Sequence, residues 1–292
     1  MTRVMGIYTY KRVEIIDSKP MMHTFVFSEV HGVQGPNEVI QCIANVLDNI
    51  PKADHVVFEM DNCCSQNKNR FFVYYCHALV LRGYCKKVSI IYRLKGHTYL
   101  NNDRVFGTIA KHLKRHTIIH PNQVPKLIEA SINKKNHTQQ KSQYLTYNQF
   151  GDWKTALVKG PHLENLAFHI TKQQILQMQE SDPSNIRFKK AVKDEWSTKK
   201  IVKDDIKTLT ASDMFLEFKP YLKLQPAYDN PPVPKNFPKK INGLKELLTI
   251  FDADELLHEI DWIEALGYVV VPKKHSKNKH IASKKSDAVK AG

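Results

Sequence analysis

The sequence predicts an α/β protein in which a mixed β-sheet is flanked by helices. Short runs rich in β-branched and aromatic residues alternate with longer segments whose apolar residues recur at helical spacing. Read in chain order, residues 1–116 follow the pattern β-β-α-β-α-β-α. A strand, a helix and a second strand in succession imply a parallel crossover, so a sheet that also contains a hairpin is mixed.

The first two predicted elements are strands that form a hairpin. Residues 4–16 (VMGIYTYKRVEII) and 21–30 (MMHTFVFSEV) have strand composition, and the residues between them, 17–20 (DSKP), are a turn signal. Residues 36–50 (PNEVIQCIANVLDNI) then place apolar side chains at helical spacing. The sequence therefore predicts a helix that packs by one face.

A parallel crossover and one further helix follow. Residues 53–62 (ADHVVFEMDN) predict a strand, residues 69–83 (NRFFVYYCHALVLRG) a strongly apolar helix, and residues 86–94 (KKVSIIYRL) a second strand. After the loop KGHTYLNN, residues 103–116 (DRVFGTIAKHLKRH) place apolar side chains on one helical face and basic side chains in the last turn. These elements complete the predicted core.

Four segments are expected along the chain. An α/β core occupies residues 1–133, and a mixed α/β extension occupies residues 134–238, ending in the proline-rich connector YDNPPVPKNFP. Within the extension, residues 214–224 (MFLEFKPYLKL) predict a short β-rich stretch. Residues 239–271 predict a small helical segment, so the C-terminal extension is mostly helical, and residues 272–292 a disordered basic tail.

The charge of the chain predicts a polyanionic partner. A formal net charge of +15, from 44 Lys+Arg against 29 Asp+Glu, favours nucleic acid, with DNA as the first choice. The alternative is that a lysine-rich surface only aids solubility. No run approaches the roughly 20 apolar residues of a membrane span, and we expect an intracellular protein without a membrane partner. The basic tail points to the nucleus. The five cysteines do not have zinc-ligand spacing.

Two aspartates stand where ligands bind in an open α/β sheet, outside the carboxyl ends of parallel strands. Asp61 follows the apolar run VVFEM, and Asp103 begins the helix after the next predicted strand. If the two strands are neighbours, both carboxylates can hold Mg²⁺ or Mn²⁺, and such ions activate the attacking oxygen in phosphodiester cleavage. In the alternative interpretation Asp61 is a turn residue and Asp103 complements a helix dipole.

Polar residues around these aspartates are candidates for contacts with phosphate. His97, in the loop before Asp103, can approach a metal ion or a phosphate, although a lone loop histidine is more often a solvated side chain. An amide-rich entrance to the helix at 69–83 can contact phosphates or bases, or can act only as a solvated cap. It consists of Gln66, Asn67, Lys68 and Asn69.

Two phrases resemble the motifs of a known family. DNCCSQNKN at residues 61–69 and GHTYLNNDRVFG at residues 96–107, with GPNEV at residues 35–39, are similar to the pattern of an uncharacterised domain family abundant in eukaryotic transposon-derived genes. That family looks like a ribonuclease H-like transposase or integrase core with an acidic triad. Looser similarity around residues 150–153 and 228–263 suggests that most of the chain belongs to the same family.

The resemblance implies roles for particular residues. Asp61 would be the second acidic metal ligand and Asp103 the third, with His97 near the scissile phosphate and Mg²⁺ or Mn²⁺ as cofactor. The implied nucleic-acid contacts are Gln66, Asn67, Lys68, Arg70 and Arg104. The first ligand belongs to an opening strand, and no acidic residue precedes Glu14. We therefore expect an N-terminally truncated ribonuclease H-like fold with an incomplete acidic site.

Glu38, in GPNEV, could partly substitute for the missing ligand. The competing interpretation is a solvent-facing helix glutamate. Three functions are therefore expected to compete: metal-dependent phosphodiester cleavage or strand transfer on DNA, a non-catalytic nucleic-acid-binding module domesticated from a transposable element, and a protein-interaction role. The last would use the apolar face of residues 252–267 (DADELLHEIDWIEALG).

Overall fold

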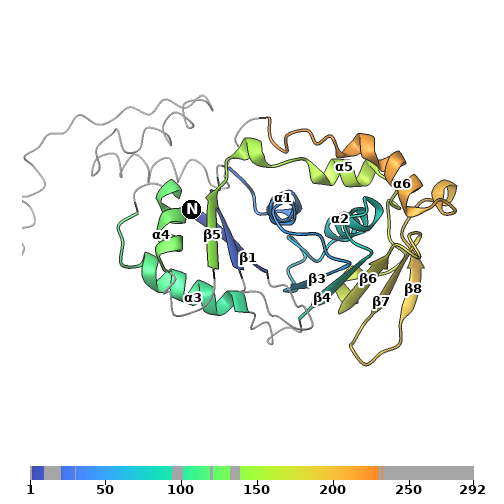
Figure 1. Cartoon of the computed structure of the whole chain (residues 1–292), viewed down its shortest axis with the longest axis horizontal. Coiled ribbons are helices and arrows are strands. Elements are labelled where there is room, and N and C mark those ends of the chain that lie inside the picture. The colour runs from blue at the N-terminus through green and yellow to red at the C-terminus, as the bar shows by residue number, and fades with distance from the viewer. Residues whose placement is uncertain are drawn as a thin grey trace, which may run out of the picture. The chain divides into compact units, whose positions relative to one another are not determined.

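The computed structural model of the chain describes residues 2–9, 21–29, 31–93, 101–118, 121–131, 139–229 and 232. These residues all lie in one compact unit, Met1–Pro232 (Figure 1). The boundary expected between residues 133 and 134 falls within this unit. The expected helical segment at 239–271 and the basic tail at 272–292 lie outside the described residues.

A three-stranded sheet contains the predicted hairpin. Strands β1 (Thr2–Thr9) and β2 (Met21–Ser28) pair antiparallel, which confirms the hairpin. Strand β5 (Gln139–Tyr144) pairs parallel with β2, in the order β1-β2-β5. Two helices pack beside this sheet, α3 (Asn101–Leu113) and α4 (Val124–Ser131), because α3 contacts β1 while α4 contacts β2 and β5.

A five-stranded mixed sheet contains the predicted crossover. Its order is β3-β4-β6-β7-β8, and only the β3–β4 pair is parallel. The strands are β3 (His55–Met60), β4 (Lys87–Tyr92), β6 (Ile175–Gln179), β7 (Asn185–Lys189) and β8 (Ser197–Lys200). Strands from the second half of the chain thus extend a sheet that the first half begins.

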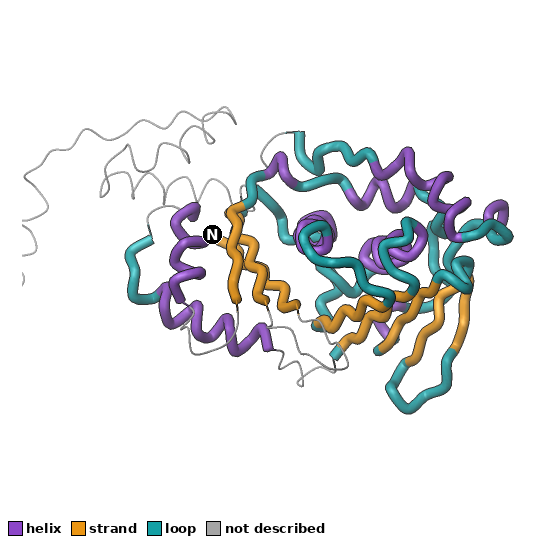
Figure 2. Tube along the Cα trace, in the orientation of Figure 1, coloured by secondary structure: helices purple, strands orange, loops and turns teal. Residues whose placement is uncertain are grey.

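Four helices share the hydrophobic core of the five-stranded sheet. These are α1 (Pro36–Leu47), α2 (Arg70–Leu81), α5 (Trp153–Lys159) and α6 (Ala211–Phe218). Figures 1 and 2 show α1 and α2 running along one face of this sheet. Short 3₁₀ turns lie at Pro121–Gln123, Tyr147–Gln149, Ile170–Lys172, Asp204–Ile206 and Lys219–Leu222. The fold is therefore the predicted α/β class, with helices flanking a mixed sheet.

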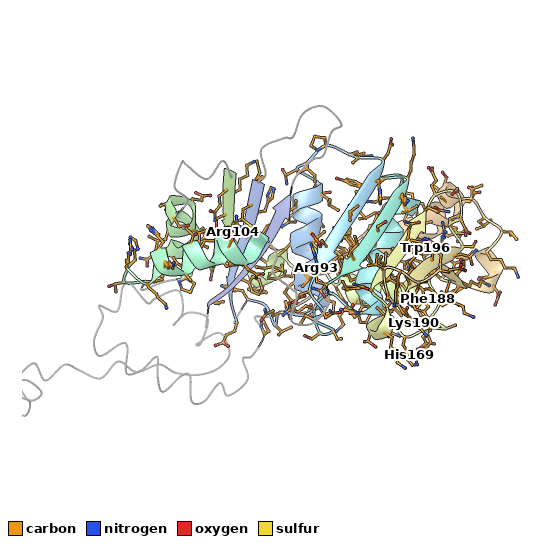
Figure 3. The ribbon with its side chains drawn as sticks, turned by 90° about the horizontal axis from the view of Figure 1, so that it is seen from below. Arg93, Arg104, His169, Phe188, Lys190 and Trp196 are labelled. Atoms are coloured by element: carbon orange, nitrogen blue, oxygen red, sulfur yellow. The ribbon has the colours of Figure 1, made fainter. Side chains whose placement is uncertain are left out.

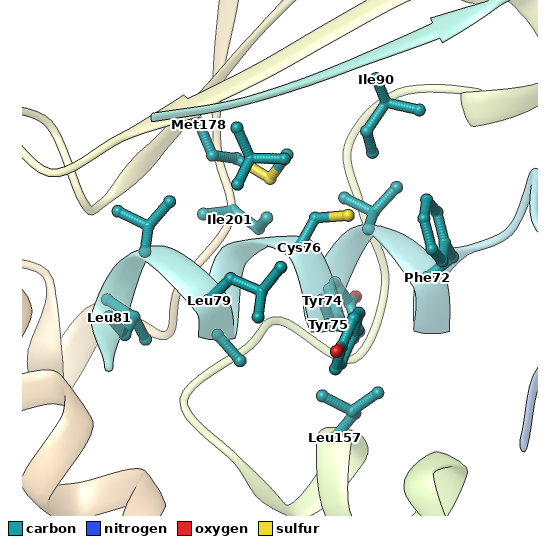
Figure 4. Packing of buried hydrophobic residues seen from close by; sticks show 14 of the residues in the cluster. Phe72, Tyr74, Tyr75, Cys76, Leu79, Leu81, Ile90, Leu157, Met178 and Ile201 are labelled. Atoms are coloured by element: carbon teal, nitrogen blue, oxygen red, sulfur yellow. The ribbon is translucent and has the colours of Figure 1, made fainter. Parts of the chain in front are cut away.

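Helix α2 is buried on all sides, since Phe72 to Leu81 are almost fully shielded from solvent. Cys76 points toward the sheet, where Ile90 and Met178 lie, while Tyr75 points toward Leu157 of α5 (Figure 4). A helix that is apolar all round needs a partner on every face. The strongly apolar composition at 69–83 follows from this position.

The arrangement differs from the prediction in two respects. The predicted strands do not share one sheet: β2 pairs with β5, and β1 and β3 each form the edge of a separate sheet. Residues 214–224 do not form the expected β-rich stretch, because Thr210 and Asp213 cap α6, and Ala211, Met214 and Phe218 at helical spacing fill the core. Within the described ranges, none of the helices has the length and apolar composition to cross a membrane.

Candidate functional site

Asp61 lies immediately after β3, at the carboxyl end of the parallel β3–β4 pair. Its carboxylate is exposed, and its Oδ1 accepts hydrogen bonds from Asn67 Nδ2 at 2.7 Å and from the Cys63 backbone amide at 3.4 Å. In the described part of the chain, no group bonds the second oxygen, Oδ2. The hydrogen bonds to Oδ1 therefore fix the orientation of the carboxylate and leave Oδ2 available to a ligand.

The loop from Asp61 to Asn69 is a tight coil that enters α2. The carbonyl of Cys63 accepts the backbone amides of Gln66, Asn67 and Lys68 at 3.0–3.3 Å. Asn69 then caps the helix, because its side-chain oxygen accepts the amide of Phe72 at 3.2 Å. The amide-rich sequence thus builds the loop itself. The backbone and side-chain contacts within this loop hold Asp61 in position just after β3.

Lys68 supports this loop from the inside. The residue is only 6% exposed, its Nζ donates to Asn62 Oδ1 at 2.5 Å, and it lies 4.7 Å from the centre of the Tyr92 ring. Tyr92 donates to the carbonyl of Asn67 at 3.1 Å, and burial raises the pKa of its phenol well above the usual value, which keeps it a neutral donor. The structure gives Lys68 and Asn67 supporting roles in place of the expected contacts with nucleic acid.

Three other predicted contact residues lie nearer the surface. Gln66 is partly exposed, and Arg70 donates from Nη1 to the carbonyl of Glu164 at 2.6 Å. Arg104 is exposed in the first turn of α3. Arg93, which the sequence did not single out, is exposed just after β4, and its carbonyl accepts from Asn62 Nδ2 (Figure 3). Gln66, Arg93 and Arg104 are therefore accessible to a phosphate backbone, although the guanidinium of Arg93 also pairs with Glu59.

Asp103 is exposed in the first turn of α3, beside Arg104. Helix α3 packs on the three-stranded sheet through Ile109, whereas Asp61 belongs to the five-stranded sheet. The connection from β4 to α3, residues 94–100, lies outside the described residues, and with it the candidate His97. Among the residues that the structure does describe, no three acidic, histidine or cysteine side chains form a group that could hold a metal ion. Pairing of Asp61 with Asp103 stays a prediction.

Glu38 is buried, at 1% exposure, so the solvent-facing side chain expected as the competing interpretation is wrong. Its Oε2 accepts the amide of Gly35 at 2.7 Å, and its Oε1 accepts the amide of Val33 at 3.3 Å and the hydroxyl of Tyr228. The carboxylate closes the loop before α1 and ties it to a residue 190 positions away. This role is structural.

Two polar features were missed by sequence reasoning. His77 and His162 are fully buried with 3.0 Å between their ring nitrogens. Helical or strand periodicity carries no signal for such a pair, because its members are 85 residues apart. The second feature is a basic hairpin around Trp196, for which the alternation of Arg187 and Lys189 along one strand was an available signal.

Comparison with known proteins finds a match to one protein family. The family described as "Domain of unknown function (DUF7869)" matches residues 10–195, which is more than half of the chain. Neither the curated proteins nor the solved structures contain a match to the chain. The matched range includes the loop at Asp61–Asn69, β3, β4 and the first turn of α3.

Proposed function

Because the chain belongs to the DUF7869 family, whose description states no activity, we propose its function from the site: metal-dependent cleavage or strand transfer of phosphodiesters in DNA, as in ribonuclease H-like transposases. The observation that carries the proposal is the position of Asp61. A carboxylate at the carboxyl end of parallel strands, held by the following loop, is where an open α/β sheet places ligands. The DNA partner makes the nucleus the expected compartment.

The residues around Asp61 fit a hard divalent cation in their chemistry. The exposed Oδ2 is an oxygen donor of the kind that Mg²⁺ and Mn²⁺ prefer, and Asn67 fixes its direction. When bound, such an ion would lower the pKa of an attacking water and offset charge on the phosphate. Asp103 would supply a second carboxylate, and Gln66, Arg93 and Arg104 would hold the phosphate backbone in place.

A nicking assay with supercoiled plasmid and Mn²⁺ tests the proposal. We expect Asp61→Asn to abolish nicking, since it removes a charged ligand while keeping the shape and hydrogen-bonding capacity of the side chain. Asp205→Asn, at an exposed position in the turn Asp204–Ile206, makes the same chemical change away from the site and should cleave at the wild-type rate. Nicking that is unaffected by Asp61→Asn would exclude Asp61 as the metal ligand.

A second candidate is a non-catalytic nucleic-acid-binding module. It is favoured by the basic hairpin of β7 and β8, which carries six exposed or half-exposed cations between residues 187 and 200, three strands away from β3 in the sheet. The same assay separates the two functions. Tight DNA binding without Mn²⁺-dependent nicking, in wild type and in Asp61→Asn alike, would support the binding module and reject the enzyme.

A further inference from the structure

We propose that the hairpin of β7 and β8 is a docking surface for single-stranded nucleic acid, on which Trp196 stacks against a base. This hairpin surface consists of Arg187, Lys189, Lys190, Lys193 and Trp196. This surface would bind nucleic acid at a place separate from Asp61. The inference rests on the proposed function only in taking nucleic acid as the partner.

The alternation of β7 places the charges on one side of the sheet. Ile186 and Phe188 are buried at 0% and 7% exposure, so Arg187 and Lys189 point to the opposite side. In the antiparallel pairing, Phe188 lies opposite Ser197, which puts Trp196 next in register, opposite Lys189. The indole and the two cations therefore share the side of β7 that faces away from the hydrophobic core.

Both cations contact the indole. The guanidinium carbon of Arg187 lies 5.0 Å from the centre of the Trp196 ring and the Lys189 Nζ lies 4.9 Å from it, both within cation–π range. Both side chains come from β7, next to the strand that follows Trp196. Trp196 is partly exposed, so part of its indole is accessible to a base. Bases stack on such rings with little regard to sequence.

The charge around the indole matches a phosphate backbone. Residues 187–200 contain two acidic residues, Asp194 and Glu195, and six basic residues: Arg187, Lys189, Lys190, Lys193, Lys199 and Lys200. Lys200 is paired with Asp204, which lies outside the hairpin. Asp194 is turned back into the hairpin, where its Oδ2 accepts the amide of Ala191 at 2.9 Å. Lys190 and Lys193 are exposed. A strand bound at Trp196 would thus pass close to several cations.

A neighbouring segment extends the basic surface. The amide of Gln174 donates to the carbonyl of Lys189 at 2.9 Å, which brings the turn Ile170–Lys172 alongside the hairpin. His169 and Lys172 in this region are exposed. Figure 3 shows His169, Lys190 and Trp196 at the same end of the molecule. The combination of an aromatic platform with flanking cations is typical of sites for single strands, in which unpaired bases are accessible for stacking.

Fluorescence anisotropy with the full chain in EDTA tests the proposal, using labelled oligothymidylate and oligouridylate of about 15 nucleotides and a DNA duplex of equal length. We expect Trp196→Ala to weaken binding of the single strands by roughly 5- to 140-fold, the loss of one base stack, and Trp196→Phe to recover most of it. Lys189→Gln with Lys190→Gln should reduce the dependence of log affinity on log salt by about 1.4. The exposed pair Lys219→Gln and Lys223→Gln is the matched control for charge.

Two results would overturn the proposal. One is equal affinity of wild type and Trp196→Ala for both single strands; the other is equal loss of single-strand and duplex binding in Trp196→Ala, which would indicate a general change in the surface. Because EDTA removes divalent ions, failure of the metal site at Asp61 leaves this experiment unaffected. Circular dichroism of each variant confirms that the hairpin variants are folded.

Discussion

The side-chain amide of Asn67 lies 2.7 Å from Oδ1 of Asp61, and this contact orients the carboxylate that immediately follows β3. The donor comes from a buried residue of the same loop, six positions later. The sequence motif DNCCSQNKN therefore couples an exposed acidic group to a buried support. Metal affinity should depend on the support as well as on the acid.

We expect Asn67→Ala to weaken Mn²⁺ binding by about 10- to 100-fold, the usual cost of losing a group that orients a ligand. Isothermal titration calorimetry with Mn²⁺ measures the change. Asn185→Ala is the matched control, because Asn185 Nδ2 donates to Asp182 Oδ1 at 2.8 Å in a turn far along the chain from the site. Equal affinity in wild type and Asn67→Ala would show that Asp61 does not bind the ion through this arrangement.

Glu38→Ala should destabilise the protein by about 1–3 kcal/mol, since it removes a buried acceptor from three part-buried donors, the amides of Gly35 and Val33 and the hydroxyl of Tyr228. Urea denaturation gives the free energy of unfolding. Glu217→Ala, an exposed glutamate in α6, should change it little. If Glu38→Ala instead unfolds like wild type but loses Mn²⁺ binding, Glu38 is a metal ligand and its structural role is wrong.

The buried His77–His162 pair should make stability fall in acid. Burial lowers the pKa of His77 to about 4 and lowers that of His162 well below its usual value. Below the ordinary histidine pKa the unfolded chain takes up protons that the folded pair does not, so stability is complete above about pH 6.5 and declines as the pH falls toward 4. The slope contributed is about 1.4 kcal/mol per pH unit for each histidine.

Urea denaturation between pH 7.5 and 5 checks this decline. Burial also lowers the pKa of His23 and of His55, so a variant is needed to isolate the pair. His77→Gln combined with His162→Gln should flatten the pH dependence, although it lowers the stability at neutral pH. His116→Gln, at an exposed position, should leave the slope unchanged. An unaltered slope in the double variant would contradict the prediction.

Alanine at two glycines should have opposite effects. A Cβ at Gly160 would lie 2.5 Å from the Phe218 ring, so Gly160→Ala should cost about 1–3 kcal/mol by overpacking. A Cβ at Gly107, inside α3, meets nothing within 4 Å, so Gly107→Ala should stabilise by about 1 kcal/mol through helix propensity. Melting temperatures measure both changes. Adding Phe218→Leu to Gly160→Ala should recover part of the lost stability. If it recovers none, the Phe218 ring is not the source of the strain.

The sequence by itself determined most of the local structure. Periodicity located the hairpin, α1, the β3–α2–β4 crossover and α3, and strand order along the chain placed Asp61 after β3. Each of these depends on residues within about one helical turn or one strand of each other, and local steric preference acts over that range. The position of Asp61 followed for the same reason, because the end of a strand is a local feature.

Only the tertiary structure decided which strands are neighbours and which polar residues are buried. Strand β2 pairs with β5, where Thr24 bonds a residue 117 positions away, and Glu38 meets Tyr228 across 190 positions. The burial of Lys68 and Glu38 could not be predicted from the sequence, because a charged side chain is buried only where the folded chain supplies its hydrogen-bond partners. Those partners are set by packing of the whole core, and no pattern within one segment specifies them.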